Sequence, residues 1–182
     1  SIGDGVALNR LQRYLSHSRN AVMNLPATSL RVEAHIDASF ATDAIDRKST
    51  TGAVIMLGGA VIWAKSGKQS IVTKSSFEAE RVALSDMASM VLWFSLFLQD
   101  LGYAIDTPIV YQDNQSAIKV AEKGTLNNDK KKHIDIRFLW IKQALDQKKL
   151  ALVYLPTDKM VADGMTKPLV GENFYQFVKA LN

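Results

Sequence analysis

Apolar and polar side chains alternate along residues 31–40, RVEAHIDASF, of the 182-residue chain. Val32, Ala34 and Ile36 would lie on one side of an extended backbone, and this period of two predicts a half-buried strand. Near its end the strand carries Asp37, which small residues follow. Because a loop at the end of a strand can admit a ligand, a carboxylate at this position is a candidate for chemistry.

The other apolar patterns predict a hairpin and a series of helices. Apolar runs at 52–57 and 60–65 flank a Gly-Gly pair and predict a β-hairpin. An apolar row at spacings of three and four predicts a long helix at 75–102. The remaining predicted elements are a helix at 5–18, a strand at 109–112, helices at 114–123 and 133–148, a strand at 150–155, a helical turn at 161–166 and a terminal helix at 172–181.

This order of elements predicts an α/β domain with a mixed sheet. Three early antiparallel strands would be followed by parallel strands that helical crossovers connect, which gives five strands flanked by helices. If the first and fourth strands are parallel neighbours, Asp37 and Asp113 meet at one edge of the sheet. A chain of this length with 47% hydrophobic content suits one core. We therefore expect an N-terminal helix and linker at 1–29 and one domain at 30–182.

The composition excludes several kinds of chemistry. Without Cys the chain has no disulfide, thiolate zinc site or cysteine nucleophile, so catalysis would depend on carboxylates, hydroxyls, His or Lys. A net charge of +4 permits a polyanionic partner. The most apolar run, 87–98, is shorter than a bilayer span and contains two serines, so we expect no membrane partner. The chain begins without Met, which suggests a fragment or a processed product.

Carboxylates such as Asp37 and Asp113, at the ends of two predicted strands, could take part in phosphodiester hydrolysis. That reaction needs an activated water and stabilisation of charge on the attacking and leaving oxygens, which two divalent ions about 3.5–4 Å apart provide. Hard ions such as Mg²⁺ are held by carboxylate oxygens. Taken singly, Asp37 is more simply explained as a strand-ending acid and Asp113 as a helix N-cap, so the hypothesis requires several acids that converge.

Five stretches of the chain carry a family resemblance. In order they are HIDASFATDAIDRKSTTGAVIMLGGAVIWAKSGKQ, TKSSFEAERVALSD, YQDNQSAIKVAEK, KKHIDIRFLWIK and YLPTDKMVADGMTKPL. From about residue 11 to 169 the chain resembles the ribonuclease H domain at the C-terminal end of the polyprotein of Ty1/copia-type LTR retrotransposons. The segment RLQRYLSHSRN resembles the tail that connects such a domain to the reverse transcriptase.

The resemblance implies an RNase H-like fold and an endonuclease that cleaves the RNA strand of RNA–DNA hybrids during reverse transcription, with two Mg²⁺ or Mn²⁺ ions. Its catalytic acids and metal ligands would be Asp37, Glu78, Asp113 and Asp163. Two alternatives stay open. At 100° per residue Glu80 lies nearer the apolar row of its helix than Glu78, which also fits a capping box with Ser75. Asp158 competes with Asp163, although a turn after a proline is a simpler role for it.

Recognition of a hybrid needs groups that contact 2′-hydroxyls and positive charge along the phosphates. The resemblance places Gln115 on the RNA minor groove. The candidate substrate-binding residues are Ser39, Ser75, Ser76, Gln115, Lys130, Lys131, Lys132 and His133. Each lysine is interpreted equally well as part of an ordinary solvated face. His133 is interpreted equally well as a helix cap. No His lies between the last strand and Asp163, where cellular RNases H carry a mobile one.

The implied partners are the RNA–DNA hybrid and the reverse transcriptase domain of the same polyprotein, in a cytoplasmic virus-like particle or in the nucleus. An alternative is a non-catalytic RNase H-like connection or nucleic-acid-binding module. Four retained acids argue against it, because clustered carboxylates repel one another and a clamp has no use for them. A nuclease of the integrase or resolvase type that acts on DNA is disfavoured by the EAE, QDNQSA and KHID stretches.

Overall fold

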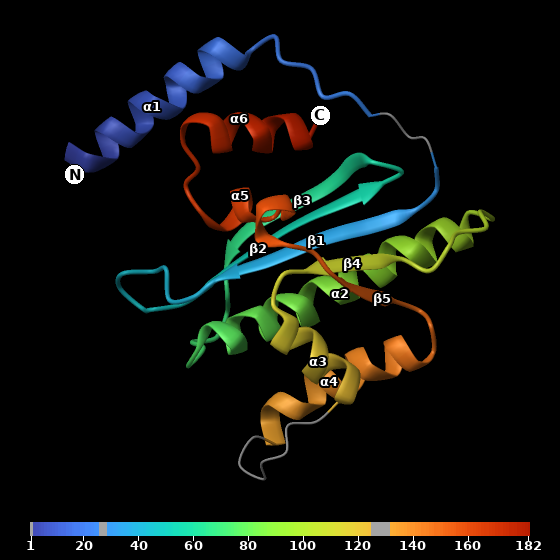
Figure 1. Ribbon diagram of the computed structural model, residues 1–182. Coiled ribbons are helices and arrows are strands. Elements are labelled where there is room, and N and C mark those ends of the chain that lie inside the picture. Colours follow the sequence, from blue (N-terminus) through green and yellow to red (C-terminus); the bar gives the residue numbers. More distant parts are fainter. Residues whose placement is uncertain (1, 26–28, 125–131) are drawn as a thin grey trace.

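The computed structural model describes residues 2–25, 29–124 and 132–182, and Figure 1 shows their arrangement. In chain order the elements are α1 (Ile2–Ser18), β1 (Val32–Ser39), β2 (Thr50–Leu57), β3 (Ala60–Lys68), α2 (Ser76–Asp100), β4 (Ile109–Gln112), α3 (Gln115–Lys123), α4 (Lys132–Asp146), β5 (Ala151–Tyr154), the 3-10 turn η1 (Thr157–Lys159), α5 (Asp163–Thr166) and α6 (Gly171–Ala180).

The five strands form one mixed sheet in the order β3-β2-β1-β4-β5. β1, β2 and β3 pair in antiparallel fashion, whereas β4 pairs parallel to β1, and β5 parallel to β4. This arrangement confirms the predicted fold class, an RNase H-like mixed sheet with flanking helices. His35 pairs with Tyr111, so two residues later Asp37 and Asp113 come level at the same ends of their strands.

β1 is more buried than the predicted half-buried strand, because His35 and Asp37 on the polar face are buried as well. Val32, Ala34 and Ile36 are fully buried in the core cluster, together with Leu84 and Val91 of α2. α2, α3 and α4 lie on this side of the sheet, whereas α5 and α6 lie on the other side (Figure 1). Asp37 lies two residues before the end of β1, where Glu80 of α2 and Thr166 of α5 both approach it.

α2 has the length and hydropathy of a membrane-spanning helix. In the structure its apolar face packs on the sheet, with Ala83, Leu84 and Met87 in the core cluster. Packing in this core accounts for the buried apolar face of α2, whereas Trp93, Leu96 and Phe97 on the same helix are about half exposed.

The hairpin extends beyond the predicted boundaries. β2 begins at Thr50 and β3 continues to Lys68, because Thr50 pairs with Lys68 and Thr51 with Gly67. These terminal pairs are mostly polar, and a search for apolar runs therefore misses them. The other predicted elements occur with ends shifted by a few residues.

α1 lies outside the sheet, beside α6 (Figure 1). The ring of Tyr14 meets that of Phe174 edge-on, with 5.9 Å between their centroids. Apolar side chains such as Leu8, Leu11 and Leu15 are more than half exposed. The helix that the amphipathic pattern predicts is therefore present, with most of its apolar row exposed.

Candidate active site

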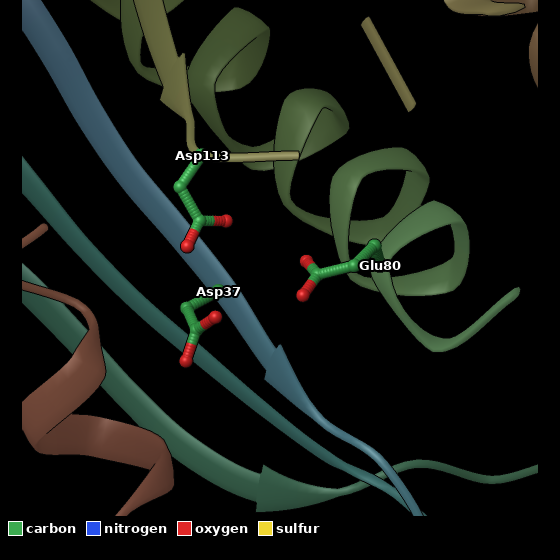
Figure 2. Close-up of side chains that lie close together, drawn as sticks. All are labelled: Asp37, Glu80 and Asp113. Carbon is green, nitrogen blue, oxygen red and sulfur yellow. The ribbon is translucent and has the colours of Figure 1, made fainter. Parts of the chain in front are cut away.

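Three carboxylates from three separate elements converge at the ends of β1 and β4. Asp37 comes from β1, Asp113 directly follows β4, and Glu80 lies in the second turn of α2. Each offers one oxygen atom, and these oxygens lie within 4.8 Å of one another. Figure 2 shows Glu80 reaching from its helix toward the two aspartates. Asp37 and Glu80 are buried and Asp113 is half-buried.

Glu78, the acid that the family resemblance favours on this helix, lies outside the group of three carboxylates. The N-cap residue Ser75 accepts a hydrogen bond from the Glu78 backbone N–H, and the Glu78 carboxylate accepts one from the N–H of Lys74 at 2.6 Å. This capping role fixes Glu78 at the start of the helix. Glu80 lies about 200° further around the helix, on its buried side, and takes the place beside the aspartates.

Gln112 connects the helix carboxylate to the β4 end of the site. Its side chain is fully buried, and Nε2 donates to Glu80 Oε2 at 3.2 Å. Its Oε1 accepts the backbone N–H groups of Asp113 at 2.8 Å and of Asn114 at 3.2 Å. One amide group therefore positions two of the three acids.

Asp113 does not serve as the N-cap of α3, which was the simpler interpretation of this residue. Asn114 is the cap, and its Oδ1 accepts the N–H groups of Ser116 and Ala117. Thr157, in the turn after β5, donates to Asp113 Oδ2 at 2.8 Å. The Asp113 carboxylate is thus directed into the site by its neighbours rather than used by the helix.

Asp163 approaches the cluster from α5. It lies outside the group of three, but Lys167 connects it to Asp37: the lysine Nζ is 2.7 Å from Asp163 Oδ1 and 4.0 Å from Asp37 Oδ2. Thr166 donates a short hydrogen bond to Asp37 Oδ2. The alternative acid, Asp158, lies in η1 and lines with Asp163 a cavity of about 560 Å³ beside α6.

A close approach between α5 and β2 holds α5 against Asp37. Gly52 pairs with Asp37 across the sheet. A Cβ on Gly52 would lie 2.8 Å from the carbonyl oxygen of Ala162 and 2.9 Å from Cβ of Met165, distances that real side chains do not adopt. Glycine at this position therefore allows α5 to reach the end of β1.

Burial and the repulsion between neighbouring carboxylates raise the pKa values of Glu80 and Asp37. Burial, followed by the negative charges of Asp37 and Asp113, raises the pKa of Glu80 to about 8, against hydrogen bonds from Gln112 and the Ala38 backbone. Burial also raises the pKa of Asp37, although Thr166 and Lys167 oppose the shift. A divalent cation would relieve this repulsion, and three convergent carboxylate oxygens are the donors that Mg²⁺ or Mn²⁺ prefers. The residues present therefore fit such an ion.

The candidate substrate-binding residues are only partly described. Ser39 is half-buried at the end of β1, Ser75 and Ser76 are exposed at the start of α2, and Gln115 is exposed at the start of α3. Lys130 and Lys131 lie outside the described residues. Lys132 and His133 begin α4, but their side chains lie outside the described part of the chain.

Four residues around the acids were not identified from the sequence: Gln112, Thr157, Thr166 and Lys167. A spacing signal exists for Lys167, which follows Asp163 by four residues and so lies on the same side of a helical turn. Gln112 carries a weaker signal, a polar side chain at the buried end of an apolar strand.

No protein-family model matches the chain. Curated relatives do match. The Pol polyprotein of transposon TNT 1-94 from Nicotiana tabacum is 32% identical over 176 residues, and that of transposon RE1 from Arabidopsis thaliana 31% over 177, each alignment covering 96% of this chain. The Gag-Pol polyprotein of Ty1-JR2 from Saccharomyces cerevisiae is 28% identical over 70% of the chain. The chain spans only 13%, 12% and 7% of these three relatives, respectively.

Solved structures share the fold. LC11-RNase H1, isolated from compost, superposes with a TM-score of 0.57 and 18% identity over 84% of this chain and 99% of its own. The same enzyme in complex with an RNA/DNA hybrid superposes with a TM-score of 0.52 and 17% identity over 74% of this chain and 93% of its own. The chain therefore belongs with the Pol polyproteins of Ty1/copia-type retrotransposons, as a segment that has the RNase H-like fold.

Proposed function

We propose that the chain is an endoribonuclease that cleaves the RNA strand of RNA–DNA hybrids by metal-dependent phosphodiester hydrolysis during retrotransposon reverse transcription. The convergence of Asp37, Glu80 and Asp113 carries this proposal, because a nucleic-acid-binding module has no need for three mutually repelling acids, two of which are buried. The fold supports it: LC11-RNase H1 has the same fold and was solved with an RNA/DNA hybrid.

In this proposal the three acids hold one Mg²⁺ or Mn²⁺ ion, and Asp37 and Asp163 hold a second. Two such ions activate a water and stabilise charge on the attacking and leaving oxygens. Asp37 is the shared ligand, because it belongs to the group of three acids and also lies beside Lys167, which follows α5. Gln112 fixes the orientation of Glu80, and Thr157 fixes that of Asp113. The two carboxylates then need not reorient during the reaction.

The polyprotein context supplies the proposed partners. Residues 1–29 would be the tail of the reverse transcriptase connection and residues 30–182 the RNase H domain, acting in a cytoplasmic virus-like particle. Ser39, Ser75, Ser76 and Gln115 lie within a few residues of the acids in the sequence and would contact the hybrid. Lys130, Lys131, Lys132 and His133 remain candidates for contacts with its phosphates.

The test is cleavage of a labelled RNA–DNA hybrid with Mg²⁺, with Asp37→Asn as the comparison. We expect cleavage by the wild type at the RNA strand and none by the variant. Equal cleavage by both proteins would contradict the mechanism, and equal cleavage of duplex DNA would contradict the specificity. A wild type that binds the hybrid but does not cut it would support the non-catalytic alternative.

A further inference from the structure

Lys167 is placed between two acids that the proposed chemistry uses on the α5 side of the site. Its Nζ is paired with Asp163 at 2.7 Å and lies 4.0 Å from Asp37 Oδ2. Asp37 is only 3% exposed, whereas the lysine side chain is 45% exposed. The ammonium group therefore reaches a buried carboxylate from a position that is open to solvent.

The charges around Lys167 show what the ammonium group compensates. The pKa of Lys167 is raised: burial alone would lower it, but the hydrogen bond to Asp163 and the negative charges of Asp37 and Asp113 outweigh burial. In return, Lys167 lowers the pKa of Asp37, which burial raises. One positive charge thus offsets part of the repulsion within the acidic site.

The location of Lys167 differs from that of the group of three acids. Glu80 and Asp113 meet Asp37 from α2 and β4, whereas Asp163 and Lys167 come from α5 and the residue after it. Two sides of Asp37 can therefore hold a cation. One side has three carboxylates in place, and the other already has an ammonium group between its two carboxylates.

We propose that Lys167 is a tethered counter-cation that holds, in the metal-free protein, the position between Asp37 and Asp163 that a second divalent ion takes during the reaction. This inference rests on the proposed function, because it assumes that both acids are ligands. Lys167 would make the binding of ions sequential: the group of three acids binds the first ion without nucleic acid.

Binding of the hybrid would draw the Lys167 ammonium group away from the position that the second ion takes. The hybrid's phosphate brings negative charge to the site, and the half-exposed lysine can turn from the two acids toward a phosphate oxygen. A lysine is suited to this exchange, since its compact ammonium group sits on a flexible stem with three donors.

The experiment measures Mn²⁺ binding to the free protein, without nucleic acid, by isothermal titration calorimetry and by electron paramagnetic resonance. We expect one ion per wild-type chain. Lys167→Met should bind a second ion, or bind it at least about tenfold more tightly, because a positive charge within a few ångströms of the site is gone. Lys167→Arg, which keeps the charge, should behave as the wild type.

Lys179→Met on α6 is the matched control, because Lys179 is exposed and lies near the end of another helix. It should leave the stoichiometry unchanged. Thermal unfolding in chelator gives a second measurement: Lys167→Met should lower the melting temperature of the metal-free protein, and Mn²⁺ should raise it more than in the wild type.

Identical one-ion isotherms for the wild type and Lys167→Met would overturn the counter-cation role and leave the proposed function standing. A wild type that binds no Mn²⁺ with the acids intact would instead count against the metal site itself, and the counter-cation role would fall with it. A Lys167→Met variant that loses its first ion would also overturn the inference, because the lysine would then support the site rather than compete for it.

Discussion

The Gln112 amide group donates to Glu80 Oε2 at 3.2 Å, while its oxygen accepts the Asp113 N–H at 2.8 Å. A single buried side chain thus fixes two acids that come from different elements. The relationship makes Gln112 a positioning residue for the proposed metal site, since the side chain itself touches no reacting atom.

Gln112→Met should weaken the metal site as well as the fold. The substitution leaves two half-buried backbone N–H groups without their acceptor and Glu80 without its donor, which costs about 1–3 kcal/mol of unfolding free energy. Urea unfolding measures that loss. A residue of purely structural importance would lower stability alone, whereas we expect Mn²⁺ affinity, measured by calorimetry on the folded variant, to fall too. Gln99→Met, an exposed change on α2, is the control, and wild-type affinity in the Gln112 variant would contradict this role.

The stability of the metal-free protein should fall as pH rises from about 4.5 to about 8, through the contribution of Glu80. Its pKa is raised from 4.5 in the unfolded chain to about 8 in the folded protein. The folded state therefore binds more protons across this range, and the contribution is fully present below 4.5 and lost as pH passes 8.

Urea unfolding in chelator at several pH values, compared between the wild type and Glu80→Gln, isolates that contribution. The variant has no group to titrate at this position, so its stability should depend less on pH. If both proteins show the same dependence, Glu80 is not held protonated by its surroundings.

Gly52→Ala should displace α5 from the site. The added Cβ would lie 2.8 Å from the Ala162 carbonyl oxygen, and backbone cannot yield as a flexible side chain does. We expect a loss of about 1–3 kcal/mol in unfolding free energy and a loss of hybrid cleavage. Gly67→Ala on β3 meets only the Lys65 side chain at 3.4 Å and serves as the control. Full activity of the Gly52 variant would show that Asp37 does not need the contact with α5.

The sequence predicts the sheet well because its signals there are local. Alternation along β1 determines which residues face the core, and Asp37 follows from the position where the alternation ends. The choice between Glu78 and Glu80 needed the structure. From the sequence, either glutamate could be the ligand, because one fits a capping box and the other, two residues later, fits the buried face of the helix. Lys167 and Asp37 are 130 residues apart in the sequence, and no periodic pattern predicts that they lie close together.

We propose that Glu80, rather than Glu78, completes the catalytic acids with Asp37 and Asp113. The most direct measurement compares hybrid cleavage in Mg²⁺ by Glu80→Gln and Glu78→Gln. Both changes replace one carboxyl group of α2 by an amide, and a glutamine at 78 can still accept the capping hydrogen bond. We expect loss of cleavage in Glu80→Gln and near wild-type cleavage in Glu78→Gln. Activity retained in Glu80→Gln and lost in Glu78→Gln would contradict it.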